Sequence, residues 1–226
     1  MRDVLVPIVT VDVVLLTLVD NKLHVVLHTR PSQPNKGELA LPGGYVHLDE
    51  DANTRDAARR VLFQKVGLIA PYLAQLQSFS GANRDIRGWS ISDTYYALVG
   101  VDALQQAEGK EPIIVKPVDA LGDLAFDHKH IIQVAVERVR NQATYSSLPL
   151  YLLPPQFTLS ELMATYEAVI NTKLDKSSFR VKVRDWDFLE AVPGAERVGA
   201  HRPAQLFRLK KNAVLSFFSK VIGEPQ

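Results

Sequence analysis

The chain has 226 residues, 46% of them hydrophobic, which is enough for one large domain or two small ones with cores of their own. Its formal net charge of +1 does not by itself indicate a partner, and the absence of cysteine excludes disulfides and thiolate metal sites. We expect no signal peptide and no membrane span, and a cytoplasmic location, because the apolar runs are too short to cross a bilayer.

The first part of the chain shows strand and helix patterns in alternation. A β-branched apolar run predicts a buried strand over residues 8–19. The turn-forming residues Asp20 and Asn21 follow it, and residues 23–29 are predicted to form a second strand that pairs with the first as a hairpin. The other predicted elements are strands over 73–79, 94–99 and 113–115 and helices over 53–66 and 128–140, the second of them capped by Asp127. This order predicts an α/β/α sandwich with a mixed sheet over residues 1–145.

A glycine pair before the first helix begins the most distinctive motif of the sequence. Gly43 and Gly44 follow a short apolar run, and Glu50, Arg60 and Gly67 come after them in that order. The stretch resembles the Nudix box, whose pattern is G, five residues, E, seven residues and R-E-U-x-E-E-x-G-U, where U is apolar. Two residues are inserted between Glu50 and Arg60 relative to that pattern.

The metal-binding positions of the box differ from the family pattern. When Arg60 and Gly67 are aligned, the three helix glutamates fall on Val61, Gln64 and Lys65. In Nudix hydrolases those glutamates hold the divalent cations that activate a diphosphate, and Mg²⁺ requires charged oxygen ligands. Valine offers no ligand, an amide is neutral and an ammonium repels the ion. We therefore expect a domain that binds a nucleotide without cleaving it, with no catalytic or metal-binding residue.

The binding site for that nucleotide is predicted from residue chemistry. Glycine allows close backbone approach to phosphate, and Arg30, at the end of the second strand, can pair with a diphosphate. Aromatic and arginine side chains elsewhere could equally be packing or surface residues. The predicted ligand-binding residues are Arg30, Gly43, Gly44, Phe79, Arg87 and Trp89.

A histidine pair at the start of the second predicted helix invites a metal hypothesis. His128 and His130 are two residues apart, so they diverge by about 200° on a helix. We therefore expect a helix cap with exposed histidines and no metal site.

A proline-containing segment divides the chain. Residues 146–156, SSLPLYLLPPQ, contain three prolines that cannot continue a helix, and they predict a linker packed on a surface. The remainder, 157–226, opens with a capping box, Thr158 with Glu161, at the start of a helix. A polar break over 171–176, a second helix from about Ser177, a hairpin of 196–198 with 205–209 and a final amphipathic helix over 213–222 are predicted to follow.

Basic residues are concentrated around the second of these helices. Residues 156–226 contain eleven basic and eight acidic residues, and five of the basic ones lie between Lys173 and Arg184 with a single acid. A charge-rich helix alone is often just a solvated face, but the hairpin with Arg202 at its tip favours a winged helix-turn-helix. The predicted DNA-binding residues are Thr172, Lys173, Lys176, Ser178, Arg180, Lys182, Arg184, His201 and Arg202.

The two domains in this order resemble the Nudix-related transcriptional regulators of NAD metabolism. The resemblance rests on the stretches LPGGYVHLDEDA, AFDHKHII and RPAQLFRL. It implies a homodimeric repressor that binds palindromic operators in double-stranded DNA. It also implies that the first domain needs no cofactor and senses ADP-ribose or a related NAD metabolite, with Arg30, Gly43 and Gly44 near that effector.

Two other functions remain open from the residues alone. The first is an active Nudix hydrolase of ADP-ribose or another nucleoside diphosphate derivative, because some enzymes of the superfamily draw ligands from outside the helix. The second is a ligand-binding module that docks protein partners. A Mg²⁺-dependent turnover assay beside a gel shift would separate the three.

Overall fold

The computed structural model describes residues 6–109, 112–197, 203–211, 213–219 and 221–223. They divide into two compact units. The first contains the described residues up to Thr17, His24–Val99 and Ala103–Val136, and the second contains Leu18–Leu23, Gly100–Asp102 and the described residues from Glu137 onward. The division therefore falls inside helix α3 (His128–Thr144), earlier than the boundary expected at residues 146–156.

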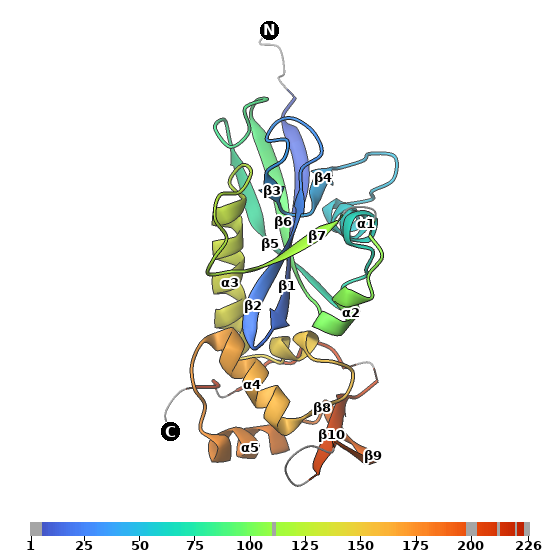
Figure 1. Cartoon of the computed structure of the whole chain (residues 1–226), viewed down its shortest axis with the longest axis vertical. Helices are drawn as coiled ribbons and strands as arrows, with labels where there is room; N and C mark the ends of the chain where they lie inside the picture. Colours follow the sequence, from blue (N-terminus) through green and yellow to red (C-terminus); the bar gives the residue numbers. More distant parts are fainter. Residues whose placement is uncertain (1–5, 110–111, 198–202, 212, 220, 224–226) are drawn as a thin grey trace. The chain divides into compact units, whose positions relative to one another are not determined.

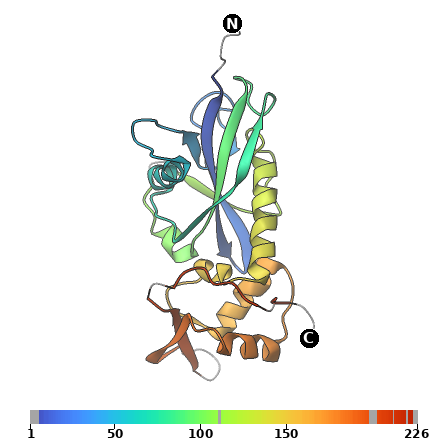
Figure 2. The ribbon, with the colours of Figure 1, turned by 180° about the vertical axis from the view of Figure 1, so that it is seen from behind.

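A mixed sheet of seven strands forms the centre of the first unit. The strands are β1 (Ile8–Val19), β2 (Lys22–Thr29), β3 (Leu39–Ala40), β4 (Gly43–Tyr45), β5 (Tyr72–Gly81), β6 (Ser90–Leu98) and β7 (Ile113–Pro117). Their order is β3-β2-β1-β6-β5, with β4 beside β1 and β7 beside β2. β1 and β6 run parallel from the pair Ile8 and Ser90 to the pair Leu16 and Leu98. Helices α1 (Thr54–Val66) and α3 lie on opposite sides of this sheet (Figure 1, Figure 2), which confirms the predicted α/β/α sandwich.

Strand β1 is buried on both faces because a helix covers each side of the sheet. Val13 and Leu15 belong to the apolar core that includes Leu62 and Val66 of α1. Side chains alternate along a strand, so Val14 and Leu16, both fully buried, face the side covered by α3. Its own buried residues are Ile131, Ile132, Ala135, Val136, Val139 and Ala143.

Both ends of α1 follow from local sequence. Asn53 precedes the helix in an extended conformation, and its side chain accepts a hydrogen bond from the amide of Asp56 at 3.1 Å. Gly67 ends the helix with φ of 80°, and a Cβ there would lie 2.3 Å from the carbonyl carbon of Glu108. The box glycine is therefore required for both its conformation and the space it leaves.

The second unit contains a helix pair and a three-stranded antiparallel sheet in the order β8-β10-β9. Its elements are the 3₁₀ helix η1 (Leu148–Leu152), β8 (Phe157–Thr158), α4 (Leu159–Ile170), α5 (Lys176–Arg184), β9 (Leu189–Arg197) and β10 (Ala204–Leu209). The predicted capping box is present: Thr158 Oγ1 accepts from the Glu161 amide at 3.2 Å, and the Thr158 amide donates to the Glu161 carboxylate at 2.7 Å. Two helices followed by a hairpin confirm the winged helix-turn-helix.

The predicted linker is an integral part of this unit. Leu148, Leu150 and Leu152 of η1 are buried, and Leu150 belongs to the core that holds Tyr166. The Tyr166 hydroxyl donates to the carbonyl of Ser146 at 2.9 Å. The prolines stop an α-helix here, but the leucines between them pack in the core.

The final helix predicted over residues 213–222 is wrong for the residues of that segment that the structure describes, which are irregular. Their backbone bonds instead to the stretch before η1: the Ser147 amide donates to the Ser216 carbonyl at 2.9 Å, and the Phe218 amide donates to the Tyr145 carbonyl at 2.8 Å. The Phe218 ring stacks on Trp186 with centroids 4.6 Å apart. The apolar residues that suggested one face of a helix thus belong to an irregular segment that packs against the core of this unit. Across the described ranges, no helix is both long and apolar enough to span a membrane.

Candidate functional site

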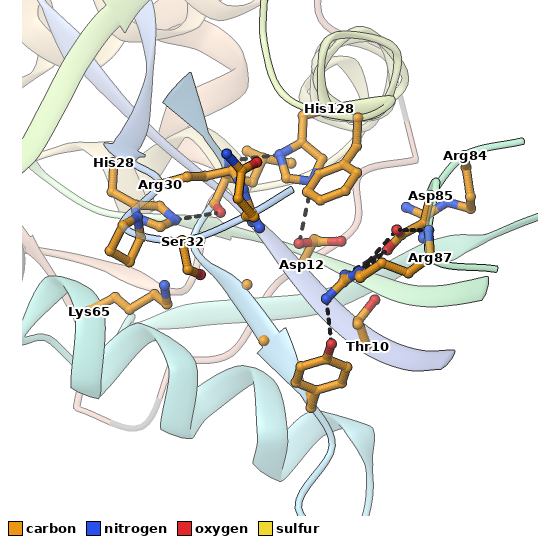
Figure 3. Close-up of a pocket in the computed structure, with 17 residues that line it drawn as sticks. Thr10, Asp12, His28, Arg30, Ser32, Lys65, Arg84, Asp85, Arg87 and His128 are labelled. Atoms are coloured by element: carbon orange, nitrogen blue, oxygen red, sulfur yellow. Dashed lines mark hydrogen bonds and ion pairs between the residues drawn. The ribbon is translucent and has the colours of Figure 1, made fainter. Parts of the chain in front are cut away.

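A cavity of about 200 Å³ in the first unit gathers residues from several separate elements. Figure 3 shows its charged side chains converging from β1, β2, α1 and the loop before β6. Of the predicted ligand-binding residues, Arg30, Gly43, Gly44 and Arg87 line it. The lining residues that the sequence did not indicate include Thr10, Asp12, His28, Lys65, Arg84, Asp85, Phe126 and His128.

The structure does not bring Phe79 and Trp89 to this cavity. Phe79 is 8% exposed and meets the ring of His130 edge-on at 5.7 Å, so it belongs to the packing between β5 and α3. Trp89 is half exposed just before β6. Its place near Arg87 in the sequence does not carry its ring to the cavity.

The glycine turn of the box forms part of the cavity wall through its pairing with β1. Gly43 is the register partner of Asp12, and a Cβ on Gly43 would lie 2.0 Å from Asp12 Oδ1. Asp12 is 7% exposed, and its Oδ2 accepts a hydrogen bond from the Ser92 hydroxyl at 2.6 Å. Gly43 therefore allows a buried carboxylate to sit against the backbone of the turn.

His128 lies beside this carboxylate and is 3% exposed, so the predicted exposure is wrong for this histidine, whereas His130 is exposed as expected. Its Nδ1 accepts a hydrogen bond from the Leu41 amide at 2.9 Å, and its Nε2 lies 3.6 Å from Asp12 Oδ1. Burial lowers the pKa of His128, and the nearby Asp12 carboxylate opposes that effect. A neutral ring that accepts at Nδ1 carries its proton on Nε2, facing Asp12.

Arg30 is held in place by an aromatic ring and a backbone carbonyl. Its guanidinium carbon lies 4.6 Å from the ring centroid of Phe126, and its Nε donates to the Pro34 carbonyl at 2.8 Å. Burial lowers the pKa of Arg30, and the positive charge of Arg87 lowers it further. The carboxylates of Asp12, Asp85 and Glu38 oppose both effects, and a bound anion would act in the same direction as these carboxylates.

Two further arginines are fixed by aspartates. Arg87 makes a forked contact with Asp85, with Nε to Oδ1 at 3.0 Å and Nη2 to Oδ2 at 2.6 Å, and it also donates to the Tyr45 hydroxyl. The hydrogen bonds to Arg87 lower the pKa of Asp85. Arg84 makes a similar pair with Asp127, at 3.0 and 2.9 Å. The side chain of Asp127, which was predicted to cap the helix, thus orients a cavity cation instead.

The box arginine organises the loop that leads to α1. Arg60 binds Asp51 through Nε to Oδ1 at 2.8 Å and Nη2 to Oδ2 at 2.7 Å, and it donates to the Tyr45 carbonyl at 2.9 Å. These hydrogen bonds lower the pKa of Asp51 to about 2. Arg60 lies 3.7 Å from Glu50, which is mostly exposed.

The three positions that carry glutamates in the family have distinct environments. Val61 is 2% exposed and packs with Val11 and Ala57 in a small apolar cluster. Gln64 is half-buried, and Lys65 lines the cavity. The part of the chain that the structure describes contains no group of three histidine or carboxylate side chains suited to a metal ion.

The second candidate site is the exposed face of α5. Asp175 caps the helix by accepting from the Ser178 amide at 2.8 Å, and Phe179 and Val183 point into the core. The opposite face exposes Lys176, Arg180 and Arg184.

The other predicted DNA-binding residues lie in different settings. Thr172 and Lys173 are exposed in the turn, where Lys173 pairs with Glu167 at 2.9 Å, and Ser178 is half-buried. Lys182 is half-buried, and its ammonium donates to the carbonyl of Val221 at 2.5 Å, which directs the side chain toward its own unit. His201 and Arg202 lie outside the described residues.

A Nudix-type sandwich with a cationic cavity, followed by a helix-turn-helix with a hairpin, defines a class of transcriptional regulators that join a nucleotide-sensing domain to a DNA-binding winged helix. Residues 149–209 match the family model of the NrtR DNA-binding winged helix domain. The chain is 38% identical over 206 residues to the ADPR responsive transcriptional repressor NtrR of Acinetobacter baylyi, an alignment that covers 89% of this chain and 82% of that protein. The chain belongs to the NrtR family.

Two solved structures support the same assignment for the fold. Shewanella oneidensis NrtR complexed with a 27mer DNA is 34% identical, with a TM-score of 0.87 over 95% of this chain and 99% of that chain. The Nudix domain of the same protein complexed with ADP ribose is 34% identical, with a TM-score of 0.55 over 59% of this chain and 89% of that chain. One of these relatives is a transcriptional repressor and the other was solved with DNA, which favours a non-enzymatic role for this chain.

Proposed function

We propose that this chain is a transcriptional repressor of NAD metabolism genes that binds a palindromic operator as a homodimer. ADP-ribose, or a related NAD metabolite, binds the cavity of the first unit and modulates operator binding. The observation that carries the proposal is the presence in one chain of a cavity lined by four basic side chains and an exposed basic face on α5. The relatives support both halves, since one is an ADPR responsive repressor and another was solved with DNA.

The cavity suits a nucleoside diphosphate. Arg30 and Arg87 are presented by fixed contacts, so little side-chain entropy would be lost when phosphates bind them. The backbone of Gly43 and Gly44 allows phosphate oxygens to approach closely. Phe126 lines the cavity with Arg30 over its ring, so the aromatic side chain of this site is Phe126 in place of the expected Phe79 or Trp89.

In our proposal, the first unit binds this ligand and does not hydrolyse it. Val61 is sealed in an apolar cluster, Gln64 is neutral and Lys65 is cationic, so none of the three replaces a metal-binding glutamate. Without a bound divalent ion, neither the attacking water nor the diphosphate is activated. This supports a sensor in which the ligand persists.

Regulation requires a difference in ligand affinity between DNA-competent and DNA-incompetent arrangements. Helix α3 is the segment in which such a difference can act. His128 in its first turn lines the cavity, and from Glu137 onward its residues belong to the second unit. A ligand that shifts the start of α3 therefore acts on an element shared by both units.

A gel shift on DNA from upstream of the chain's own gene and its gene neighbours tests the proposal, with ADP-ribose titrated from zero to saturation. We expect a discrete complex whose stability changes with ADP-ribose, and no ADP-ribose turnover when the same protein is incubated with Mg²⁺. Rapid Mg²⁺-dependent hydrolysis without any DNA complex would instead establish the hydrolase alternative.

A further inference from the structure

We propose that Asp12 and His128 together bind one hydroxyl group of the ligand, so that the cavity selects nucleoside diphosphates that carry a pendant sugar. The carboxylate accepts the hydroxyl hydrogen, and the imidazole Nε2–H donates to the hydroxyl oxygen. The inference rests on the proposed function, since it concerns the same cavity and names the part of the ligand that this cavity distinguishes.

Asp12 presents one fixed carboxylate oxygen to the cavity. Its Oδ2 accepts a hydrogen bond at 2.6 Å from the hydroxyl of Ser92, which is fully buried in β6. Its Oδ1 lies against the backbone of the turn at Gly43. The sheet therefore sets the orientation of this carboxylate before any ligand binds, and Oδ1 keeps lone pairs for a further donor.

The partners of Asp12 differ from those of Asp85, the other carboxylate in the cavity lining. Asp85 is held by forked hydrogen bonds from Arg87. Within the part of the chain that the structure describes, no lysine or arginine forms an ion pair with Asp12. A carboxylate of this kind gains a strong hydrogen bond when a neutral donor binds it. It also repels phosphate, so the group that approaches it must be another part of the ligand.

The imidazole of His128 supplies a matching donor. Its Nδ1 accepts from the Leu41 amide at 2.9 Å, so the ring proton is on Nε2. Nε2 lies 3.6 Å from Asp12 Oδ1, a separation longer than a hydrogen bond (Figure 3). An N–H donor and a carboxylate acceptor thus face each other across a gap, and both residues line the cavity.

A hydroxyl group satisfies both atoms, because it donates one hydrogen and accepts at its oxygen. An oxygen at a hydrogen-bond distance of about 2.8 Å from each atom forms a triangle with the 3.6 Å separation, so the two contacts can be made at once. A phosphate oxygen has no hydrogen to donate and an alkyl group can do neither. The pair therefore favours the hydroxyl of a sugar over the other parts of a simple diphosphate ester.

The surroundings of this pair suit a sugar better than a nucleobase. Phe126 is the aromatic ring beside His128, with centroids 5.4 Å apart, and the guanidinium carbon of Arg30 lies 4.6 Å from its centroid. These two contacts leave less of the ring for a base to stack on. Ser92 and Thr10, which lie near Asp12 in the sheet, carry hydroxyl groups of their own. A ribose needs hydrogen-bond partners and no stacking face, so the pendant sugar is the part of the ligand assigned to this end of the cavity.

Isothermal titration calorimetry of the full chain tests the inference with two ligands of equal charge. One is ADP-ribose, and the other is the ethyl ester of ADP, in which an ethyl group replaces the pendant ribose. We expect the wild type to bind ADP-ribose about tenfold or more tightly than the ester, since hydrogen bonds to a charged group are absent from the ester complex. Asp12→Asn should reduce this preference by about fivefold or more, because the remaining hydrogen bond is neutral. Asp123→Asn, at an exposed position outside the cavity lining, should retain the wild-type preference.

A spectroscopic measurement on the wild type keeps the test independent of the folding of Asp12→Asn, which thermal unfolding monitors. The imidazole ¹⁵N resonance of His128 Nε2 should shift more on saturation with ADP-ribose than on saturation with the ethyl ester, because only the ribose supplies a hydroxyl to this nitrogen. Equal shifts with the two ligands overturn the inference.

The outcomes separate the inference from the proposed function. Equal affinity of the wild type for the two ligands overturns the inference. So does an equal loss of both ligands in Asp12→Asn, which would mean that Asp12 is structural or binds the adenosine part. Either result leaves the sensor function intact. Absence of ADP-ribose binding to the wild type overturns the proposed function and this inference with it.

Discussion

Gly43 and Asp12 face each other in the register of β4 with β1, and the space for a side chain on Gly43 is already filled by the Asp12 carboxylate. A Cβ on Gly43 would lie 2.0 Å from Asp12 Oδ1 and 2.9 Å from the Val11 carbonyl oxygen. The neighbouring Gly44 is different, because the nearest atom to its Cβ position is Val61 Cγ2 at an ordinary 3.5 Å. Two adjacent glycines of one motif therefore have distinct physical requirements.

The first prediction follows from this asymmetry. Gly43→Ala should lower the free energy of unfolding by about 2 kcal/mol or more, because either Asp12 or the β4 backbone must move. Gly44→Ala should change it by less than about 0.5 kcal/mol, since a methyl group fits there. Urea unfolding of both variants measures the difference. Equal losses would show that β4 does not pair with β1 in this register.

The second prediction concerns the ion pair that shapes the box loop. Asp51→Asn should destabilise the chain by about 2 kcal/mol, because the largely buried Arg60 would lose a forked carboxylate partner. Asp49→Asn, two residues earlier and exposed, is the matched control and should have little effect.

The pH dependence of the same pair has a defined sign. The pKa of Asp51 is lowered from 3.8 to about 2 in the folded chain. The contribution of this carboxylate to the free energy of unfolding is therefore complete above pH 3.8 and is lost as the pH falls toward 2. The free energies of unfolding of the wild type and of Asp51→Asn, measured over an acid titration, should therefore converge at low pH. A difference in the free energy of unfolding that stays constant with pH would show that the charge of Asp51 is not the source of the stabilisation.

Local sequence predicted most elements because their boundaries depend on neighbouring residues. Asn53 and Gly67 mark the ends of α1, Thr158 with Glu161 marks the start of α4, and the turn at Asp20 and Asn21 has the positive φ that such a turn requires. The failed helix over residues 213–222 shows the limit. An amphipathic pattern does not determine a helix when the backbone finds other hydrogen-bond partners, here in residues 144–147.

The cavity was only partly predictable for a related reason. Gly43, Gly44 and Arg30 belong to a motif or a strand end, where sequence spacing carries information. Asp12 and His128 lie far apart in the sequence and meet only through the sheet and the start of α3. The spacing of the histidines on α3 gave their divergence correctly, but it could not tell which of them faces the core.

The third prediction uses the buried His128. Its pKa lies below the ordinary value of 6.5, chiefly because of burial, so the unfolded chain binds more protons between the two values. The free energy of unfolding should therefore rise with pH through that window and fall as the medium is acidified below 6.5. His128→Gln should flatten this part of the profile, whereas His130→Gln, at an exposed position, should not. Identical profiles for the two variants would contradict a role for His128.

The fourth prediction separates the cations of α5 by their environment. Arg180→Ala and Arg184→Ala, on the exposed face, should weaken binding to operator DNA by about 1–3 kcal/mol each if their side chains contact bases, with a smaller loss on random duplex. Lys182→Ala removes an equal charge from the same helix, but its ammonium is bonded to the Val221 carbonyl, so DNA affinity should change little while stability falls. Fluorescence anisotropy at several salt concentrations measures both the affinity and the number of phosphate contacts, because each lost contact reduces the salt slope by about one. Equal losses from all three variants, or from operator and random duplex alike, would mean that α5 contributes charge without reading the sequence.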